Sequence, residues 1–270
     1  MDTVETAEGS VAYERAGEGP PLVLLHACPG DHRDYAAVQP ALARSHTTWA
    51  LDWPGFGGSP PPRPPAGASA LGYARVLAAF VDALDLHDVR LVGNSVGGYA
   101  AASLAIGQRG RVERLVLVDS SGFTRHGRFT RSVCRLLGNE TATRRLSGPL
   151  ARCYLRRSND TVRGMRRRAA APGRERAAVQ AALWRSFTEP DSDLRARAAT
   201  ITAPTLVVWG RRDPLLPLRR DGRHCRRALP DARFAAVPTG HAAFAEDPAG
   251  FLALVEPFLV DAAVVPGARR

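Results

Sequence analysis

The chain has 270 residues, of which 45% are hydrophobic, a composition that suits one large globular domain with an insertion or, at most, two domains. Acids at Asp2 and Glu5, and the lack of an apolar run long enough to cross a bilayer, argue against a signal peptide and a membrane span, so we expect a soluble cytoplasmic protein. The four cysteines show neither C-x-x-C spacing nor clustering with histidines, which argues against a zinc site and a disulfide framework.

The net charge of +11 is concentrated in one segment. Between Arg125 and Arg197 there are 18 Arg and 6 acids, a local charge of +12, whereas the remainder holds 19 Arg and 20 acids. Because the chain contains no Lys, part of this bias is a general preference for Arg. Most of these arginines are expected to solvate a helical surface, and the alternative is that the segment faces an anionic partner.

The first part of the chain predicts alternating strands and helices. Residues 3–6 and 10–14 alternate as an edge hairpin, and the apolar run Leu22 to Leu25 is typical of a strand buried on both faces. We further expect a helix over 35–43, a strand over 46–51 and a helix over 71–84.

The stretch from Val89 to Ala101 predicts a buried strand, a sharp turn and a packed helix. Its turn has the pattern G-x-S-x-G, with Gly93 and Gly97 around Ser95. Such a turn holds its serine in a strained conformation, because side chains at the glycine positions would clash. Strain there exposes the hydroxyl and directs the amide of Val96 at any negative charge that develops beside it.

The rest of the chain predicts an insertion between two sheet strands. A strand over 112–118 is followed by Arg-rich helical stretches to about residue 200, and then by strands over 205–209 and 233–237 and helices over 218–228 and 251–260. We therefore expect an α/β fold, with a mostly parallel sheet covered by helices on both faces. Residues 1–120 and 201–270 would form its core, and 121–200 a helical cap over the carboxyl ends of the strands.

A serine nucleophile needs a base that takes its proton and an acid that orients the base. Asp213 follows one predicted strand and His241 follows the last one, so the order along the chain is Ser, Asp, His. Asp119 also stands at the end of a strand and is an alternative for the orienting acid.

At these residues the sequence resembles the α/β-hydrolase superfamily, in its capped serine esterase-like group. The resemblance covers nearly the whole chain and rests on five separated motifs, which are His26-x-x-Pro29-Gly30, Asp52-x-Pro54-Gly55-x-Gly57-x-Ser59, Gly93-x-Ser95-x-Gly97, Gly210-x-x-Asp213 and Gly240-His241. Five matches in the correct order are far more specific than any one of them.

The resemblance implies Ser95 as nucleophile, His241 as general base and acid, and Asp213 as the residue that orients it. It also implies an oxyanion hole from the backbone amides of Val96 and Cys28, although Ala27 stands where the family usually has glycine. His26 is expected to be a structural hydrogen-bonding residue beneath this loop. No metal or organic cofactor is implied.

A serine at this turn excludes the relatives that use an aspartate nucleophile, so the chain is predicted to hydrolyse a small carboxylic ester through an acyl-enzyme. Thioester hydrolysis and hydrolysis of a carbon–carbon bond in a diketone are the alternatives among enzymes, and a catalytically idle ligand-binding fold is the alternative from another class. Nucleic-acid binding is not expected, because aromatic residues are sparse in the basic segment. Its arginines, among them Arg156, Arg157 and the run Arg166 to Arg168, could instead face an anionic substrate, an acidic carrier protein or an anionic membrane surface.

Overall fold

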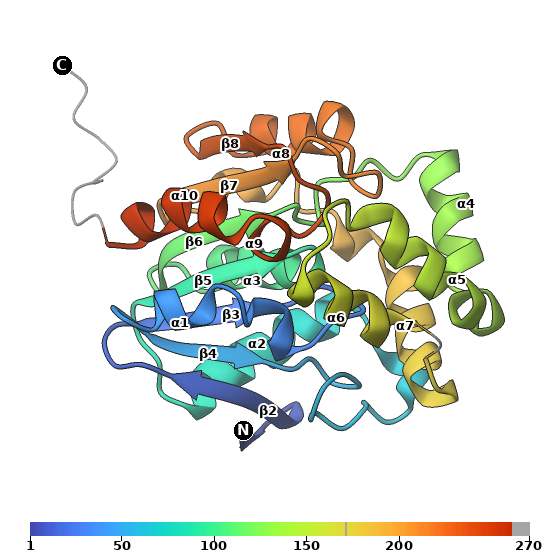
Figure 1. Ribbon diagram of the computed structural model, residues 1–270, viewed down its shortest axis with the longest axis horizontal. Helices are drawn as coiled ribbons and strands as arrows, with labels where there is room; N and C mark the ends of the chain where they lie inside the picture. Colours follow the sequence, from blue (N-terminus) through green and yellow to red (C-terminus); the bar gives the residue numbers. More distant parts are fainter. Residues whose placement is uncertain (171, 261–270) are drawn as a thin grey trace.

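The computed structural model describes residues 1–170 and 172–260, and its strands form one eight-stranded sheet in the order β1-β2-β4-β3-β5-β6-β7-β8 (Figure 1). The strands are β1 (Asp2–Thr6), β2 (Gly9–Ala16), β3 (Pro21–Leu25), β4 (Thr47–Leu51), β5 (Val89–Asn94), β6 (Val112–Val118), β7 (Thr205–Gly210) and β8 (Arg233–Val237). β2 pairs antiparallel with β1 and β4, and all other neighbours are parallel. The predicted α/β sheet is therefore confirmed.

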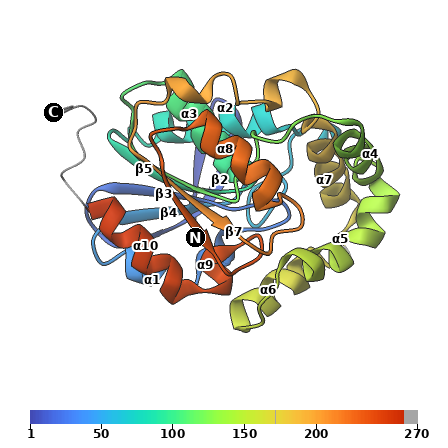
Figure 2. The same cartoon turned by 90° about the horizontal axis from the view of Figure 1, so that it is seen from above.

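Helices cover both faces of the sheet because side chains along each buried strand point alternately to the two sides. In β3, Val23 and Leu25 join the apolar cluster under α2, α3 and α8, whereas Leu22 and Leu24 join the cluster under α1, α9 and α10. Figure 2 shows these two helical layers on opposite sides of the sheet. The helices are α1 (Gln39–Leu42), α2 (Ala70–Ala83), α3 (Val96–Gly107), α8 (Arg223–Ala228), α9 (Ala243–Glu246) and α10 (Pro248–Val260).

Two predicted helices differ from the structure. The expected helix over 35–43 is a short 3₁₀ helix, η1 (His32–Tyr35), followed by the one-turn α1. Pro40 has no amide hydrogen to donate to a preceding turn, so it favours the start of a helix over its interior, and α1 begins with Pro40 in its first turn. The expected helix over 218–228 begins with a wider π turn, Leu218–Gly222, and is α-helical only from Arg223.

The segment between β6 and β7 contains α4 (Arg128–Leu137), α5 (Glu140–Tyr154), α6 (Asp160–Ala169) and α7 (Arg174–Ser186). Both views show these helices together at one end of the sheet (Figures 1 and 2). There α6 packs against η1 and α9, and α7 packs against η2 (Pro65–Gly67). Among the described helices, none combines the length and the apolar character needed to cross a membrane.

Candidate active site

Ser95 occupies the sharp turn between β5 and α3. Its backbone has φ +55° and ψ −116°, a strained conformation for a residue other than glycine. A Cβ on Gly93 would lie 2.4 Å from the carbonyl oxygen of Gly97, and one on Gly97 would lie 2.3 Å from that of Leu25. The two glycines therefore let three backbone segments meet at the serine, as the G-x-S-x-G pattern indicates.

His241 follows β8 and is bonded to Asp213, which follows β7. Nδ1 of the imidazole lies 2.7 Å from Oδ2 of Asp213, and both side chains are buried. The other carboxylate oxygen, Oδ1, accepts hydrogen bonds from the amides of Leu215 and Leu216 at 2.8 and 3.2 Å. A proton on Nδ1 satisfies this arrangement and leaves Nε2 of the imidazole as an acceptor.

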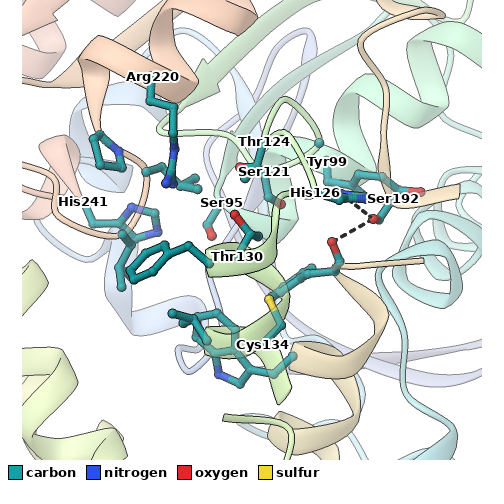
Figure 3. Close-up of a pocket in the computed structure, with 18 of the residues that line it drawn as sticks. Ser95, Tyr99, Ser121, Thr124, His126, Thr130, Cys134, Ser192, Arg220 and His241 are labelled. Carbon is teal, nitrogen blue, oxygen red and sulfur yellow. Dashed lines mark hydrogen bonds between the residues drawn. The ribbon is translucent and has the colours of Figure 1, made fainter. Parts of the chain in front are cut away.

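Ser95 and His241 line the same cavity, which has a volume of about 230 Å³ (Figure 3). Within the described residues no hydrogen bond joins the Ser95 hydroxyl to His241. Such contacts often tighten only when substrate is bound. The apolar part of the lining comes from helices α4 and α7 and the loop after β7, and consists of Phe129, Val133, Trp184, Phe187, Leu215 and Leu216.

Asp119, the alternative acid, stands at the end of β6 and its carboxylate accepts the amide of Gly210 at 2.8 Å. Burial and the negative charge of Asp213 raise the pKa of Asp119 well above its ordinary value. The raised pKa disfavours the carboxylate form of Asp119, which is the form that an orienting residue needs. The structure places Asp213, and not Asp119, in a hydrogen bond with His241.

The same three side chains, Asp119, Asp213 and His241, offer ligand atoms within 4.8 Å of one another. Nδ1 of His241 and Oδ2 of Asp213 are only 2.7 Å apart, so they bond to each other and do not converge on a common ion. The raised pKa of Asp119 also disfavours the carboxylate form that metals bind. The chemistry of this donor set fits a hydrogen-bonded catalytic group better than a metal site.

The loop after β3 contains the second expected oxyanion donor, Cys28. As predicted, His26 lies beneath this loop: its Nε2 accepts the amide of Trp53 at 3.0 Å and its Nδ1 lies 2.7 Å from the carbonyl oxygen of Ala27. Burial lowers the pKa of His26, which agrees with a neutral ring that donates through Nδ1. Burial raises the pKa of the Cys28 thiol to about 12, with Arg176 opposing the shift, so this thiol is protonated and is no nucleophile.

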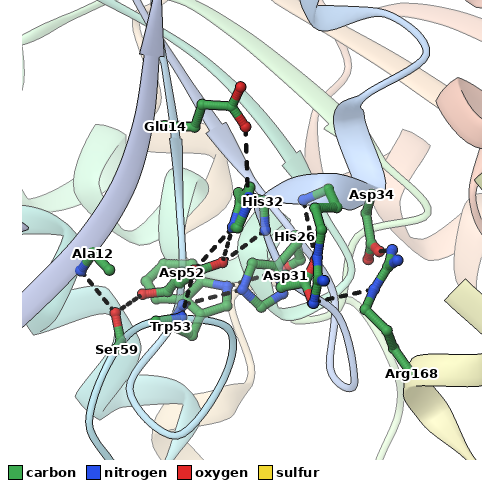
Figure 4. A network of polar contacts seen from close by, with 12 residues as sticks. Ala12, Glu14, His26, Asp31, His32, Asp34, Asp52, Trp53, Ser59 and Arg168 are labelled. Carbon is green, nitrogen blue, oxygen red and sulfur yellow. Dashed lines mark hydrogen bonds and ion pairs between the residues drawn. The ribbon is translucent and has the colours of Figure 1, made fainter. Parts of the chain in front are cut away.

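A network of charges joins the same loop to the Arg-rich segment (Figure 4). Arg168 on α6 contacts Asp34 at 2.5 Å through Nη2 and Asp31 at 3.1 Å through Nε. Asp31 also accepts the guanidinium of Arg33 at 2.6 Å. Arg168, which the sequence suggests as a contact for an anionic substrate, therefore links α6 to the loop after β3. Arg157 is similarly engaged, 3.2 Å from Asp247.

We expect Asp34→Asn to change how stability depends on pH. Burial raises the pKa of Asp34 from 3.8 to about 7, so the stability that its neutral form provides is present below pH 4 and is lost as the pH rises through 7. The free energy of unfolding of the variant should therefore rise relative to that of wild type between pH 4 and 8, by up to about 4 kcal/mol. Urea unfolding at several pH values measures this difference.

Asp31→Asn is the matched control for that experiment. Although burial opposes the shift, the hydrogen bond from Arg33 and the charge of Arg168 lower the pKa of Asp31. Its carboxylate form is stabilising, so the free energy of unfolding of this variant should fall relative to that of wild type as the pH rises from acid through 4. Both variants lose a contact with Arg168, which changes their free energy of unfolding by an amount that is the same at every pH. A difference between wild type and Asp34→Asn that stays flat over pH 4 to 8 would contradict the expected ionisation.

Sequence reasoning missed several residues that hold or surround the site. The side-chain amide of Asn94 donates to the carbonyl oxygen of His241 at 2.9 Å, and Glu246 binds the backbone around the histidine. The sequence also did not predict that His32 is largely buried, with its ring 2.9 Å from Asp52. The only sequence signal for a role of Glu246 is its place directly after the apolar run 242–245, because a carboxylate that such a run buries needs partners.

Arg176 on α7 is a further cation that the sequence did not single out. Its Nε and Nη2 atoms are buried and make no hydrogen bond within the described residues, and its guanidinium lies 5.1 Å from the ring centre of Phe56. Its charge acts on the pKa of Cys28, in the loop after β3, and on that of Tyr154, which lies beside His241. Arg176 is thus a half-buried cation whose charge acts on groups at the candidate site.

The comparisons with known proteins agree with this geometry. Residues 20–248 match the alpha/beta hydrolase fold family. A pimeloyl-[acyl-carrier protein] methyl ester esterase from Aeromonas hydrophila is 30% identical over 272 residues, covering 93% of this chain and 99% of the relative. A 2-hydroxy-6-oxo-2,4-heptadienoate hydrolase from Pseudomonas putida is 29% identical and covers 90% of each chain. A solved thermophilic esterase from Thermogutta terrifontis shares the fold, with a TM-score of 0.80, 23% identity and coverage of 96% and 97%.

Proposed function

This chain belongs to the alpha/beta hydrolase family and is a hydrolase, and we propose that it cleaves small carboxylic esters with Ser95, His241 and Asp213 as its catalytic residues. The observation that carries the proposal is the 2.7 Å hydrogen bond between His241 and Asp213 at the wall of a cavity that Ser95 also lines. Ester hydrolysis is favoured because the similar Aeromonas hydrophila protein is named as a methyl ester esterase.

The reaction begins when Oγ of Ser95 attacks the ester carbonyl carbon while Nε2 of His241 takes the hydroxyl proton. The backbone amides of Val96 and Cys28 donate to the resulting oxyanion, and Asp213 stabilises the imidazolium. Collapse of the tetrahedral intermediate breaks the bond to the alcohol, which leaves with the proton from His241. Water, deprotonated by His241, then hydrolyses the acyl-Ser95 ester and restores the enzyme.

The helical segment 121–200 acts as a cap that selects the substrate. Its helices α4 and α7 supply Phe129, Val133 and Trp184 to the cavity, and these side chains suit an apolar acyl or alcohol group. A volume of about 230 Å³ favours substrates of modest size.

A substrate that carries a carboxylate is favoured by Arg176, which does not itself line the cavity but whose charge acts on Cys28 and whose Nε and Nη2 atoms are buried without a hydrogen bond within the described residues. A guanidinium left in this state is stabilised when an anion binds to it. The same feature suits the second candidate reaction, hydrolysis of a carbon–carbon bond, since the similar Pseudomonas putida protein is named for a substrate that is a carboxylic acid.

The test compares a neutral ester with an ester of similar size that bears a terminal carboxylate, together with a matching thioester and a diketone acid. We expect wild type to prefer the carboxylate ester. Arg176→Gln should lower kcat/KM for that ester by about tenfold to a hundredfold and leave the neutral ester unchanged, because a hydrogen bond to a charged group is lost. Arg174→Gln, at an exposed position on the same helix, is the control. Turnover of none of the four compounds would overturn the proposed function, and faster cleavage of the diketone acid would favour the second candidate.

Added salt separates a direct contact from long-range attraction by the basic segment. If the +12 of residues 125–197 steers anions, kcat/KM for the carboxylate ester should fall steeply with salt in wild type and in Arg176→Gln alike, since exposed charges are screened within about 8 Å. An acidic carrier protein that bears the acyl group should show this salt dependence most strongly. Equal salt dependence for neutral and charged esters would remove the steering role.

A further inference from the structure

Glu246, on the short helix α9, has a buried carboxylate that accepts hydrogen bonds from backbone amides far apart in the sequence. Its Oε2 lies 3.0 Å from the amide nitrogens of Gly240, Arg156 and Arg157. Its Oε1 lies 3.5 Å from the amide of Ala242. The side chain is 3% exposed, so water does not replace these contacts.

The bound amides belong to two segments that meet at the candidate active site. Gly240 and Ala242 flank His241, whereas Arg156 and Arg157 begin the linker between α5 and α6. The two segments also bond directly, because the amide of His241 donates to the carbonyl oxygen of Tyr154 at 3.0 Å. One carboxylate therefore fastens the backbone on both sides of the histidine to the start of the linker.

The approach of these segments leaves no room for adjustment. A Cβ on Gly240 would lie 2.1 Å from the carbonyl oxygen of Tyr154 and 2.7 Å from Oε1 of Glu246. The ring of Tyr154 lies edge-on to the imidazole, with ring centres 5.5 Å apart. Without the carboxylate, the amides of Gly240, Arg156 and Arg157 would lose their acceptor and the loop that carries His241 would have to relax.

We propose that Glu246 is a positioning residue for His241, which it holds in register with Ser95 by anchoring the loop 240–242 to the linker after α5. The inference rests on the proposed function, in which His241 is the general base. A displacement of about 1 Å at a catalytic base can lower turnover by about a hundredfold, so loss of the anchor should reduce the rate of chemistry more than it reduces binding.

The experiment measures how fast a small fluorophosphonate labels Ser95, together with kcat and KM for a minimal ester, well below the unfolding temperature of each variant. Glu246→Ala should label ten to a hundred times more slowly than wild type and lose kcat to the same extent, with KM unchanged. Glu246→Gln keeps an oxygen that can accept the three amides, so its labelling rate should stay within about threefold of wild type. Asp247→Asn is the matched control, because Asp247 pairs with Arg157 but has no contact with the histidine loop, and its rate should not change.

A spectroscopic readout distinguishes positioning from general stabilisation. The proton between His241 and Asp213 should give a far-downfield resonance, assigned by its loss in Asp213→Asn, that is retained in Glu246→Gln and broadened or shifted in Glu246→Ala. If the Ala variant does not fold, Glu246→Asp takes its place, since a carboxylate one methylene shorter cannot reach all three amides.

Labelling of Glu246→Ala at the wild-type rate would overturn the inference, and so would equal losses in the Ala and Gln variants. Failure of the proposed function looks different, because wild type itself would then remain unlabelled at Ser95.

Discussion

Replacement of Ser95 by Ala should leave a folded protein whose ester turnover is lower by on the order of 10³ or more. The reason is that acyl transfer loses its nucleophile, while the turn keeps its glycines and the oxyanion donors keep their places. Turnover is measured with the best ester from the substrate panel, and folding with thermal unfolding of both proteins.

A fluorophosphonate supplies the second measurement, because it should attach to wild type at Ser95 alone and leave Ser95→Ala unmodified. Ser103→Ala is the control, since Ser103 lies on the same helix, α3, but does not line the cavity. It should be labelled and active like wild type. Unlabelled wild type, combined with unchanged hydrolysis in Ser95→Ala, would end the esterase proposal and favour a ligand-binding role.

Asp213→Asn should lower kcat by about 10³ to 10⁴ with little change in KM. An Asn amide cannot hold the imidazole with its proton on Nδ1 as the carboxylate does, and it does not stabilise the imidazolium that forms when Ser95 is deprotonated. Steady-state kinetics across a range of substrate concentrations separate the loss in kcat from any change in KM.

Asp119→Asn provides the contrast. Burial and Asp213 raise the pKa of Asp119 and so favour its neutral form, which an uncharged Asn resembles, and the Asn oxygen can still accept the amide of Gly210. The variant should be only mildly affected. If Asp119→Asn were crippled and Asp213→Asn active, the orienting acid would be Asp119.

The sheet and the serine turn could be predicted because their signals are local. An unbroken apolar run such as Leu22 to Leu25 fits only a strand covered on both faces, and the glycines around Ser95 are required by contacts that follow from the turn itself. The helix expected over 35–43 was wrong, because Pro40 lacks an amide hydrogen and favours the start of a new helix.

The supports of the site could not be predicted, since they depend on contacts between residues remote in sequence. Arg168 and Asp34 are 134 positions apart, and Asn94 and His241 are 147 apart. From the local charge, the arginines are predicted to face solvent or an anionic partner. In the structure, Arg168 instead pairs with the buried carboxylates of Asp31 and Asp34, because buried charges need partners. The roles proposed for Ser95, His241, Asp213, Val96 and Cys28 stay predictions until the variants are measured.

The position of the helical segment bears on how such a protein could be rebuilt. Residues 121–200 leave β6 and return to β7, and these strands are parallel neighbours in the sheet, so exchanging the segment for another would leave the topology of the sheet unchanged. The exchange has a constraint, however, because the backbone from Tyr154 to Arg157 bonds to the loop that carries His241 directly, at Tyr154, and through the carboxylate of Glu246, at Arg156 and Arg157. A chimaera designed for new substrates should therefore replace α4 and α7 and keep residues 154–157 unchanged.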